Sequence, residues 1–336
     1  MDKRNNRQVI LVSRPVGVPE PRHFEVKTSP LAALQEEQFL VENIYLSVDP
    51  AQRGYVNEEN NYSPALPLGA VMRAMAVGRV AESRHPDFEV GEYLYGWFGW
   101  QDYWIGGAEG LLRRVDPSQA PLSAGAGLLG INGLTAWLAL HEIGRPKAGD
   151  TVVVTAAAGA VGSLVGQLAK LAGCRTVAVV GSDEKGELCL SRYGYDAYVN
   201  YRHPLDEALA LACPSGIDLF FDNVAGSIAD TLIRHMNVFG RVVQCGTMSI
   251  PVWIPPPQGP RMQREILTRR LRIEGFVIFD HIARFDEAAA ALAQLLKSGK
   301  LQYDEDIETD LALAPQALVD VYEGRNRGKK LIRLRD

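Results

Sequence analysis

The segment TVVVTAAAGAVGSLVGQLAK, residues 151–170, constrains the fold of this chain more than any other. A run of β-branched residues leads directly into a turn of small residues, and the turn opens an apolar helix. In that helix Leu164, Leu168 and Leu171 recur at helical spacing, and Gly173 stands where a helix would end. A strand, tight turn and helix in this order predict the first unit of a dinucleotide-binding α/β fold.

The turn itself has the residue pattern of a phosphate site. Such a site needs a tight turn, a residue small enough for pyrophosphate to approach the backbone, and a small residue where helix and strand pack closely. Ala157, Gly159 and Gly162 occupy these three places. The helix start then offers unpaired N–H groups and a positive dipole end to the phosphates. We therefore predict a bound dinucleotide here.

The end of the next strand indicates which dinucleotide is bound. An NAD site usually has Asp or Glu there, which binds the ribose hydroxyls. This chain has Gly181 and Ser182 at the strand end, and Asp183 and Glu184 suit the first turn of the following helix. Lys185 could reach a ribose 2′-phosphate, or it could be a solvated helix lysine. The missing strand-end acid favours NADP over NAD.

The chain divides into two patterns. Up to about residue 125, short segments rich in Val, Ile, Tyr and Trp predict an antiparallel sheet or partial barrel. From Thr151 onward, strands alternate with helices, which predicts a parallel sheet covered on both faces. A last helix over 284–297 precedes KKLIRLRD, a strand that we expect to return to the first domain. We expect a mostly β domain of residues 1–126 and 300–336 and an inserted α/β domain of residues 127–299.

Composition narrows the possible partners. The formal net charge of −5 argues against a polyanionic partner, and the basic residues at 269–272 and 325–330 are typical of solvated faces. No apolar run approaches a membrane span or a secretory signal. The four cysteines, at 174, 189, 213 and 245, lack metal-like or disulfide spacing. We expect a cytoplasmic protein without a nucleic-acid or membrane partner.

Ordered motifs along nearly the whole chain carry a family resemblance. They include SVDPAQR (47–53), GWQDY (99–103), AAAGAVGS (156–163), VGSDEK (180–185), FDNVAG (221–226), EGFVIF (274–279) and GRNRGK (324–329). The chain resembles the medium-chain dehydrogenase/reductase superfamily and, more narrowly, its zinc-independent leukotriene/prostaglandin reductase branch, with curcumin-reductase-like and 2-alkenal-reductase-like enzymes. The resemblance implies a Rossmann-type doubly wound parallel sheet inserted into a GroES-like partial barrel.

The resemblance also implies a set of residues that bind NADP(H). They are Gly159, Ala160, Val161, Gly162, Ser182, Lys185, Tyr201, Asn223, Cys245, Gly246, Thr247, Phe276, Val277, Ile278 and Asn326. The first four would hold the pyrophosphate, Lys185 and Tyr201 the 2′-phosphate, and residues 276–278 the nicotinamide side. By composition, Tyr201 and Phe276 are equally compatible with core positions.

The sequence lacks the groups of Cys, His and Glu side chains that a catalytic zinc ion would need. The first 173 residues contain no cysteine, the six histidines are scattered singly, and YSPALPLGAVM stands where zinc-dependent relatives carry a His-Glu ligand motif. Reduction of a conjugated C=C bond needs no Lewis acid, because the enolate oxygen can be stabilised by hydrogen bonds. We therefore expect metal-free reduction of α,β-unsaturated ketones and aldehydes.

The catalytic donor is the point at which the chain departs from its relatives. They typically have a tyrosine after the CG of the loop at 245–246, and Pro251 stands there instead. Tyr62 and Tyr103 are the candidate replacements, although either could be a packed aromatic and solvent could supply the proton. Trp100 and Trp253 are the candidates to line a pocket for a small hydrophobic carbonyl substrate, and Trp100 could equally belong to the core.

Two other functions stay open. A quinone reductase of the same superfamily would need no proton donor for an α-carbon, and the lost tyrosine favours it. A non-catalytic NADPH-binding sensor is the third alternative. The last strand of the α/β domain, near EGFVIF, would leave an open sheet edge, and such edges are usually paired or covered. We expect a homodimer that forms through this edge.

Overall fold

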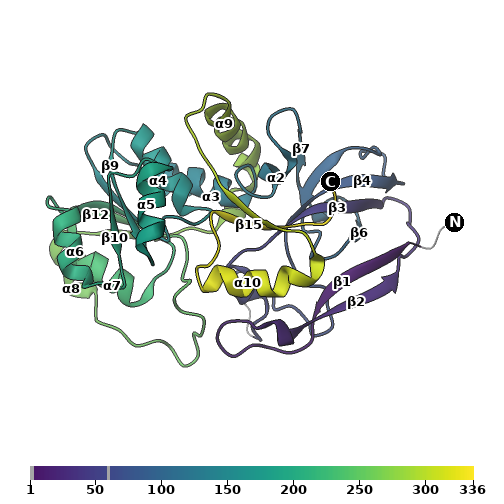
Figure 1. Cartoon of the computed structure of the whole chain (residues 1–336), viewed down its shortest axis with the longest axis horizontal. Coiled ribbons are helices and arrows are strands. Elements are labelled where there is room, and N and C mark those ends of the chain that lie inside the picture. Colours follow the sequence, from purple (N-terminus) through teal and green to yellow (C-terminus); the bar gives the residue numbers. More distant parts are fainter. Residues whose placement is uncertain (1–3, 59–60) are drawn as a thin grey trace. The chain divides into compact units, whose positions relative to one another are not determined.

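The computed structural model describes residues 4–58 and 61–336. Its contacts divide the chain into two compact units, Met1–Gly130 with Glu305–Asp336 and Ile131–Asp304. Figure 1 traces the helices and strands of both units. The domain limits expected from the sequence, residues 1–126 with 300–336 and 127–299, stay a prediction.

The first unit is built mostly from antiparallel strands, as the β-rich pattern predicted, with one parallel pair at an edge of its larger sheet. A two-stranded ribbon pairs β1 (Asn5–Leu11) with β2 (Phe24–Pro30). A seven-stranded sheet has the order β14-β15-β3-β4-β5-β7, with β6 also paired to β3. Its strands are β3 (Phe39–Ser47), β4 (Ala76–Ser83), β5 (Tyr93–Gly96), β6 (Tyr103–Gly106), β7 (Leu111–Val115), β14 (Glu305–Glu308) and β15 (Lys329–Arg333).

Short helices fill the connections of this unit. They are η1 (Pro21–His23), α1 (Gln52–Tyr55), η2 (Ala108–Gly110), α2 (Leu122–Gly125), η5 (Leu311–Leu313) and α10 (Ala314–Tyr322). The strand within KKLIRLRD is β15, and it pairs antiparallel with β3. The prediction that the C-terminal strand returns to the first domain is confirmed.

The second unit is a six-stranded parallel sheet with the order β10-β9-β8-β11-β12-β13. Its strands are β8 (Thr151–Thr155), β9 (Arg175–Val180), β10 (Ala197–Asn200), β11 (Ile217–Asp222), β12 (Met236–Gln244) and β13 (Arg272–Gly275). The chain runs outward from β8 to β10 and then crosses back to β11, so the strand order reverses between β8 and β11. This is the predicted doubly wound topology.

Helices connect these strands, as the alternating pattern predicted. They are α3 (Ile131–Ala139), η3 (Leu140–Gly144), α4 (Gly162–Leu171), α5 (Asp183–Ser191), α6 (Leu205–Ala212), α7 (Gly226–Arg234), α8 (Gln263–Arg269), η4 (Ile278–Arg284) and α9 (Phe285–Lys297). Because parallel connections are right-handed, helices that connect strands leftward and rightward cover opposite faces of the sheet. The expected helix over 284–297 is α9.

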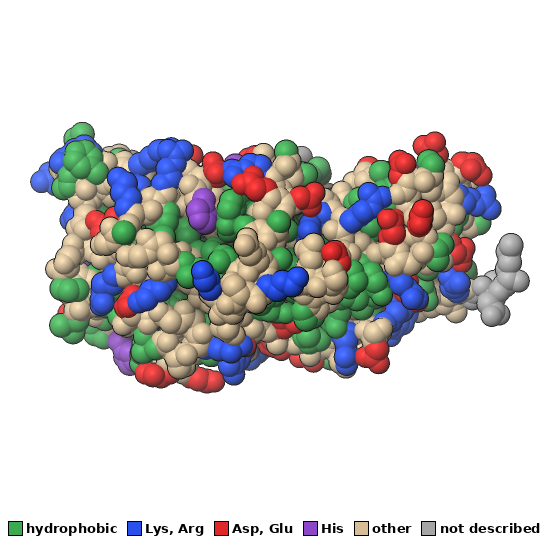
Figure 2. Space-filling model, turned by 90° about the horizontal axis from the view of Figure 1, so that it is seen from above, with side chains coloured by type: hydrophobic (Ala, Val, Ile, Leu, Met, Phe, Trp, Pro, Cys, Tyr) green, Lys and Arg blue, Asp and Glu red, His purple; other side chains and the backbone are tan. Residues whose placement is uncertain are grey.

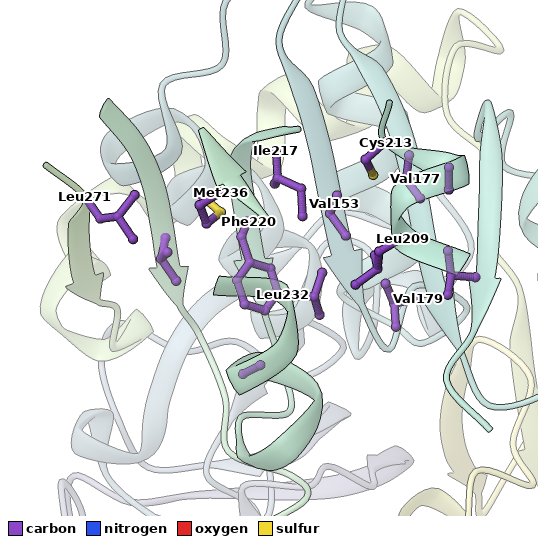
Figure 3. Packing of buried hydrophobic residues seen from close by; sticks show 14 residues of the cluster. Val153, Val177, Val179, Leu209, Cys213, Ile217, Phe220, Leu232, Met236 and Leu271 are labelled. Atoms are coloured by element: carbon purple, nitrogen blue, oxygen red, sulfur yellow. The ribbon is translucent and has the colours of Figure 1, made fainter. Parts of the chain in front are cut away.

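The core on one face of this sheet contains β-branched and aromatic side chains. Val153, Val179 and Phe220 from the strands pack against Leu209 of α6 and Leu232 of α7, and all five are at most 1% exposed (Figure 3). Every residue of β8 is buried, as its unbroken apolar sequence predicted. This packing fixes the strand ends from which the candidate site is built.

The visible surface mixes charges of both signs. On the face shown in Figure 2, Lys and Arg side chains are interspersed with Asp and Glu side chains. Within residues 4–58 and 61–336, no helix combines the length and apolar composition that crossing a membrane requires.

Candidate functional site

The predicted cofactor residues of the second unit share one edge of its sheet. All six strands are parallel, so their carboxyl ends meet there, and the switch in strand order lies between β8 and β11. The segments that follow the six strands are 156–163, 181–185, 201–203, 223–226, 245–247 and 276–278. All predicted cofactor residues except Asn326 lie in these segments. Asn326 belongs to the first unit, where its Nδ2 donates to the carbonyl of Gly328 at 2.8 Å.

The turn between β8 and α4 is tight because one residue adopts a left-handed backbone. Ala156 has φ +49°, and the N–H of Gly159 donates to its carbonyl at 2.9 Å. A Cβ on Gly162 would lie 2.4 Å from that carbonyl oxygen and 2.7 Å from Cα of Ala157. The turn residue with a left-handed backbone is therefore Ala156 rather than Ala157. Glycine is required at position 162 because a Cβ there would clash with the backbone of the turn.

Residues 159–161 are partly exposed, whereas the helix behind them is buried. Tyr195 donates from its hydroxyl to the carbonyl of Gly162 at 2.7 Å, which fixes the start of α4. A Cβ on Gly166, inside α4, would lie 2.0 Å from Cζ of Tyr195, so the glycine at this position allows the helix to pack closely on that ring. Tyr195 therefore holds the start of α4 in place, and the partly exposed backbone before it can bind a phosphate.

The ends of β9 and β10 hold the residues predicted for a 2′-phosphate. Ser182 caps α5, and its Oγ accepts from the N–H of Lys185 at 3.3 Å, so Asp183 and Glu184 are first-turn residues as predicted. Burial lowers the pKa of Lys185 from its ordinary value. The hydroxyl of Tyr201 lies against Gly181, where a Cβ would be 2.6 Å away. Lys185 and Tyr201 therefore lie in the segments that follow the neighbouring strands β9 and β10.

Asp222, at the end of β11, organises the centre of this edge and was missed by sequence reasoning. Its carboxylate is buried and accepts hydrogen bonds from Thr155 (3.0 Å), the backbone of Val224 (2.9 Å) and Ala225 (3.0 Å), and Gln244 (3.0 Å). Burial raises its pKa, and these donors oppose that shift. One carboxylate thus connects the ends of β8, β11 and β12. In the sequence, the signal for Asp222 was an acid directly after the apolar residues 219–221.

The predicted cofactor residues near Asp222 lie in the loops after β11, β12 and β13. Asn223 donates from Nδ2 to the carbonyl of Thr155 at 2.7 Å. A Cβ on Gly246 would lie 2.7 Å from the carbonyl oxygen of Asn223, so these loops touch. Burial, with the charge of Asp222, raises the pKa of Cys245 to about 12, which makes it a neutral thiol. Phe276 is buried and stacks on His281 at 4.8 Å between centroids.

In the first unit, Tyr62 lies in a group of tyrosines. Its own ring is 54% exposed. Burial raises the pKa of both Tyr55 and Tyr322, and Tyr62 adds a smaller contribution in the same direction. Tyr55 is completely buried, with the guanidinium of Arg73 5.3 Å from its ring centre. Tyr62 is thus an exposed residue whose side chain interacts with the buried Tyr55.

Trp100 corrects the predicted pocket. It is completely buried and donates from Nε1 to the carbonyl of Ser47 at 3.1 Å, so it is a core residue of the first unit. The expectation that it lines a pocket is wrong because β-sheet packing covers it. Trp253, by contrast, is 48% exposed in the Pro-rich loop.

Tyr103, on β6, has structural partners. Its hydroxyl lies 3.4 Å from Oε1 of Glu42, and the guanidinium of Arg335 lies 4.6 Å from its ring centre. Of the two candidate tyrosines, Tyr62 is the more exposed one.

Among residues 4–58 and 61–336, no three His, Cys, Asp or Glu side chains stand close enough together to hold a metal ion. The residues at the sheet edge instead fit a dinucleotide phosphate. A small-residue turn leaves the backbone partly exposed at residues 159–161, and Lys185 and Tyr201 are the residues predicted for a further phosphate group.

Comparisons with known proteins agree with this architecture. Residues 7–113 match the family model described as the N-terminal domain of oxidoreductase, and residues 160–294 match the one described as zinc-binding dehydrogenase.

Three relatives span almost the whole chain. The NADPH-dependent curcumin reductase of Escherichia coli is 39% identical over 99% of this chain and 98% of its own. The NADP(+)-dependent 2-alkenal reductase of Nicotiana tabacum is 36% identical over 98% and 97%. The crystal structure of CurA from Vibrio vulnificus in complex with NADPH has a TM-score of 0.92 at 36% identity and covers 98% and 99%. The chain therefore belongs to the medium-chain dehydrogenase/reductase superfamily, in its leukotriene/prostaglandin reductase branch.

Proposed function

We propose that this protein reduces the conjugated C=C bond of α,β-unsaturated ketones and aldehydes with NADPH. The observation that carries the proposal is full-length similarity, at 36–39% identity, to reductases named for curcumin and 2-alkenals. Both names denote conjugated carbonyl substrates and the phosphorylated coenzyme. The donors that flank the end of β9 support the same coenzyme.

The cofactor residues given above keep their proposed roles. The backbone of 159–162 binds the pyrophosphate, and Ser182, Lys185 and Tyr201 surround the 2′-phosphate. Residues 223, 245–247 and 276–278 line the rest of the edge, and Asn326 keeps its predicted role in binding the cofactor. When bound, NADPH supplies the hydride that the β-carbon of the substrate accepts.

The protein's own part is orientation and charge stabilisation. Negative charge develops on the carbonyl oxygen, so a donor must point at that atom. We assign this role to the hydroxyl of Tyr62, since that of Tyr103 lies close to Glu42. The α-carbon then takes its proton from Tyr62 or from water, which completes the addition of one hydride and one proton. Trp253 in the exposed loop covers the apolar part of the substrate.

A homodimer belongs to the proposal. β13 is the edge strand of the six-stranded sheet, and its Ile273 is 41% exposed. An open edge with an apolar side chain favours pairing with a second copy. The expected substrate is a small hydrophobic carbonyl compound, and the cytoplasm is the expected location.

Quinone reduction is the second candidate. Pro251 stands at the position of the family's tyrosine, and a proline has no proton to donate. A quinone takes up electrons at its ring and oxygen atoms, so it needs no proton at an α-carbon.

The decisive experiment follows NADPH absorbance with 2-alkenals, open-chain enones and quinones. We expect turnover of the first two, with a saturated carbonyl as product. Turnover of quinones alone would support the second candidate. NADPH binding without turnover of any class would leave a non-catalytic sensor.

A further inference from the structure

Asn200, the last residue of β10, connects two loops at the candidate 2′-phosphate site. It pairs with Val180 across the parallel strands β9 and β10, so the residues after each strand are neighbours. Its side chain is only 9% exposed, which is unusual for an amide at a strand end. The two loops that follow β9 and β10 contain Ser182, Lys185 and Tyr201, the residues predicted to set cofactor choice.

The amide of Asn200 uses both of its ends. Nδ2 donates to Oδ1 of Asp183 at 3.1 Å, and Oδ1 accepts from the N–H of Arg202 at 3.1 Å. The first bond joins the start of α5 to β10, and the second forms a local turn after the strand. His203 lies on the same side, with Nε2 3.8 Å from Oδ2 of Asp183.

Asp183 is the acid that could have served an NAD site. A carboxylate at the end of this strand accepts hydrogen bonds from the ribose hydroxyls of NAD and repels a 2′-phosphate. The contacts of Asp183 instead run toward Asn200 and His203, whereas Tyr201 lies against Gly181. Its direction is therefore set by a neighbour rather than by its position in the sequence.

We propose that Asn200 is a positioning residue for cofactor choice: its hydrogen bond to Asp183 fixes the direction of that carboxylate, which would otherwise accept from the ribose hydroxyls of NAD and repel a 2′-phosphate. The inference rests on the proposed use of NADP(H). It assigns to Asn200 a role in specificity without contact with the cofactor.

The test uses Asn200→Ser in the full chain. A serine hydroxyl can still accept from the N–H of Arg202, but it is too short to reach Asp183. Isothermal titration with NADP⁺ and with NAD⁺ gives the ratio of the two dissociation constants. We expect the preference for NADP⁺ to fall about tenfold, equivalent to ~1.4 kcal/mol. Adding Asp183→Asn to this variant removes the repelling charge and should restore the ratio to within roughly threefold.

Asn237 provides the matched control. It is also a bridging asparagine, with Nδ2 bonds to Ser215 (2.9 Å) and Asp218 (2.8 Å), but it lies near the amino end of β12. Asn237→Ala should leave the ratio unchanged. A selective wild type with an equally selective Asn200→Ser, or a double variant without recovery, overturns the role of Asn200. A wild type that binds both cofactors equally overturns the proposed use of NADP(H) instead.

Discussion

Lys329 and Asp49 form an ion pair inside the first unit: Nζ lies 2.7 Å from Oδ1, and each side chain is 4% exposed. Lys329 also donates to the carbonyl of Val48 at 2.9 Å. Burial holds the pKa of Lys329 below its ordinary value, and Asp49 opposes that shift. The pair connects β15 to the segment after β3, so a C-terminal strand is fixed to the N-terminal part of the chain by charge as well as by its backbone ladder.

Breaking this pair should destabilise the protein strongly. Lys329→Met leaves the carboxylate of Asp49 buried without its cation, which costs about 3–5 kcal/mol. Urea unfolding measures the loss. Arg22→Met is the control, because the Arg22–Glu20 pair is exposed and such pairs contribute about 0–1 kcal/mol. Equal effects of the two substitutions would show that burial of the first pair has no energetic consequence.

Lys185→Ala should weaken NADPH binding much more than NADH binding, because only NADPH carries the 2′-phosphate. A charge-assisted hydrogen bond contributes roughly 1.5–3 kcal/mol, so a roughly 10- to 100-fold loss is expected for NADPH. Fluorescence titration of both cofactors measures it, with exposed Lys297→Ala as the control. A similar loss for both cofactors would make Lys185 a bystander.

Gly162→Ala and Gly159→Ala form a graded pair at the phosphate turn. The added Cβ would lie 2.4 Å from the carbonyl oxygen of Ala156 in the first variant and 3.1 Å from it in the second. Because the first contact is with rigid backbone, we expect a stability loss of about 1–3 kcal/mol for Gly162→Ala and a smaller one for Gly159→Ala. Thermal unfolding ranks them, and the reverse order contradicts the turn geometry.

Tyr62→Phe tests the proposed donor. Removing one hydrogen bond to a developing oxyanion lowers kcat by roughly a hundredfold, with little change in NADPH affinity. Tyr103→Phe should change kcat by less than about threefold, since the Tyr103 hydroxyl faces Glu42. Steady-state rates with a 2-alkenal distinguish the two. An unaffected Tyr62→Phe assigns protonation and oxyanion stabilisation to other groups or to water.

Asp196 should make stability depend on pH. Burial opposes its charged form, but hydrogen bonds from Lys170 and from the backbone of Thr176 (2.8 Å) outweigh it and lower the pKa below its ordinary 3.8. The carboxylate therefore binds protons less readily in the folded than in the unfolded protein. Its contribution is complete above about pH 5 and is lost as pH falls through the folded-state pKa.

The corresponding variant is Asp196→Asn, compared with wild type by urea unfolding at pH 7, 5 and 3. The stability difference should be largest at pH 7 and should shrink at pH 3. Lys170→Met should weaken this dependence. A difference that stays constant across the three pH values would rule out the linkage.

Local patterns predicted much of this architecture. The β-branched run, the small-residue turn and the leucine spacing predicted β8, the phosphate turn and α4, because strand, turn and helix preferences act over a few neighbouring residues. Alternating strands and helices predicted the doubly wound sheet, since right-handed parallel connections leave few topologies. The placement of Asp183 and Glu184 in the first turn of α5 followed from the same local chemistry, whereas the capping role of Ser182 was not predicted.

Side-chain partners were beyond the reach of these patterns. Nothing in the sequence near Asp183 indicates that Asn200 holds it, and Trp100 has the composition of a pocket residue although the sheet buries it. Asp49 and Lys329 are 280 positions apart, and only the pairing of β15 with β3 brings them together. Periodicity reports which way a residue faces within its own element. Its burial, its charge state and its hydrogen-bond partner depend on what other elements place against it, and that is a property of the folded chain.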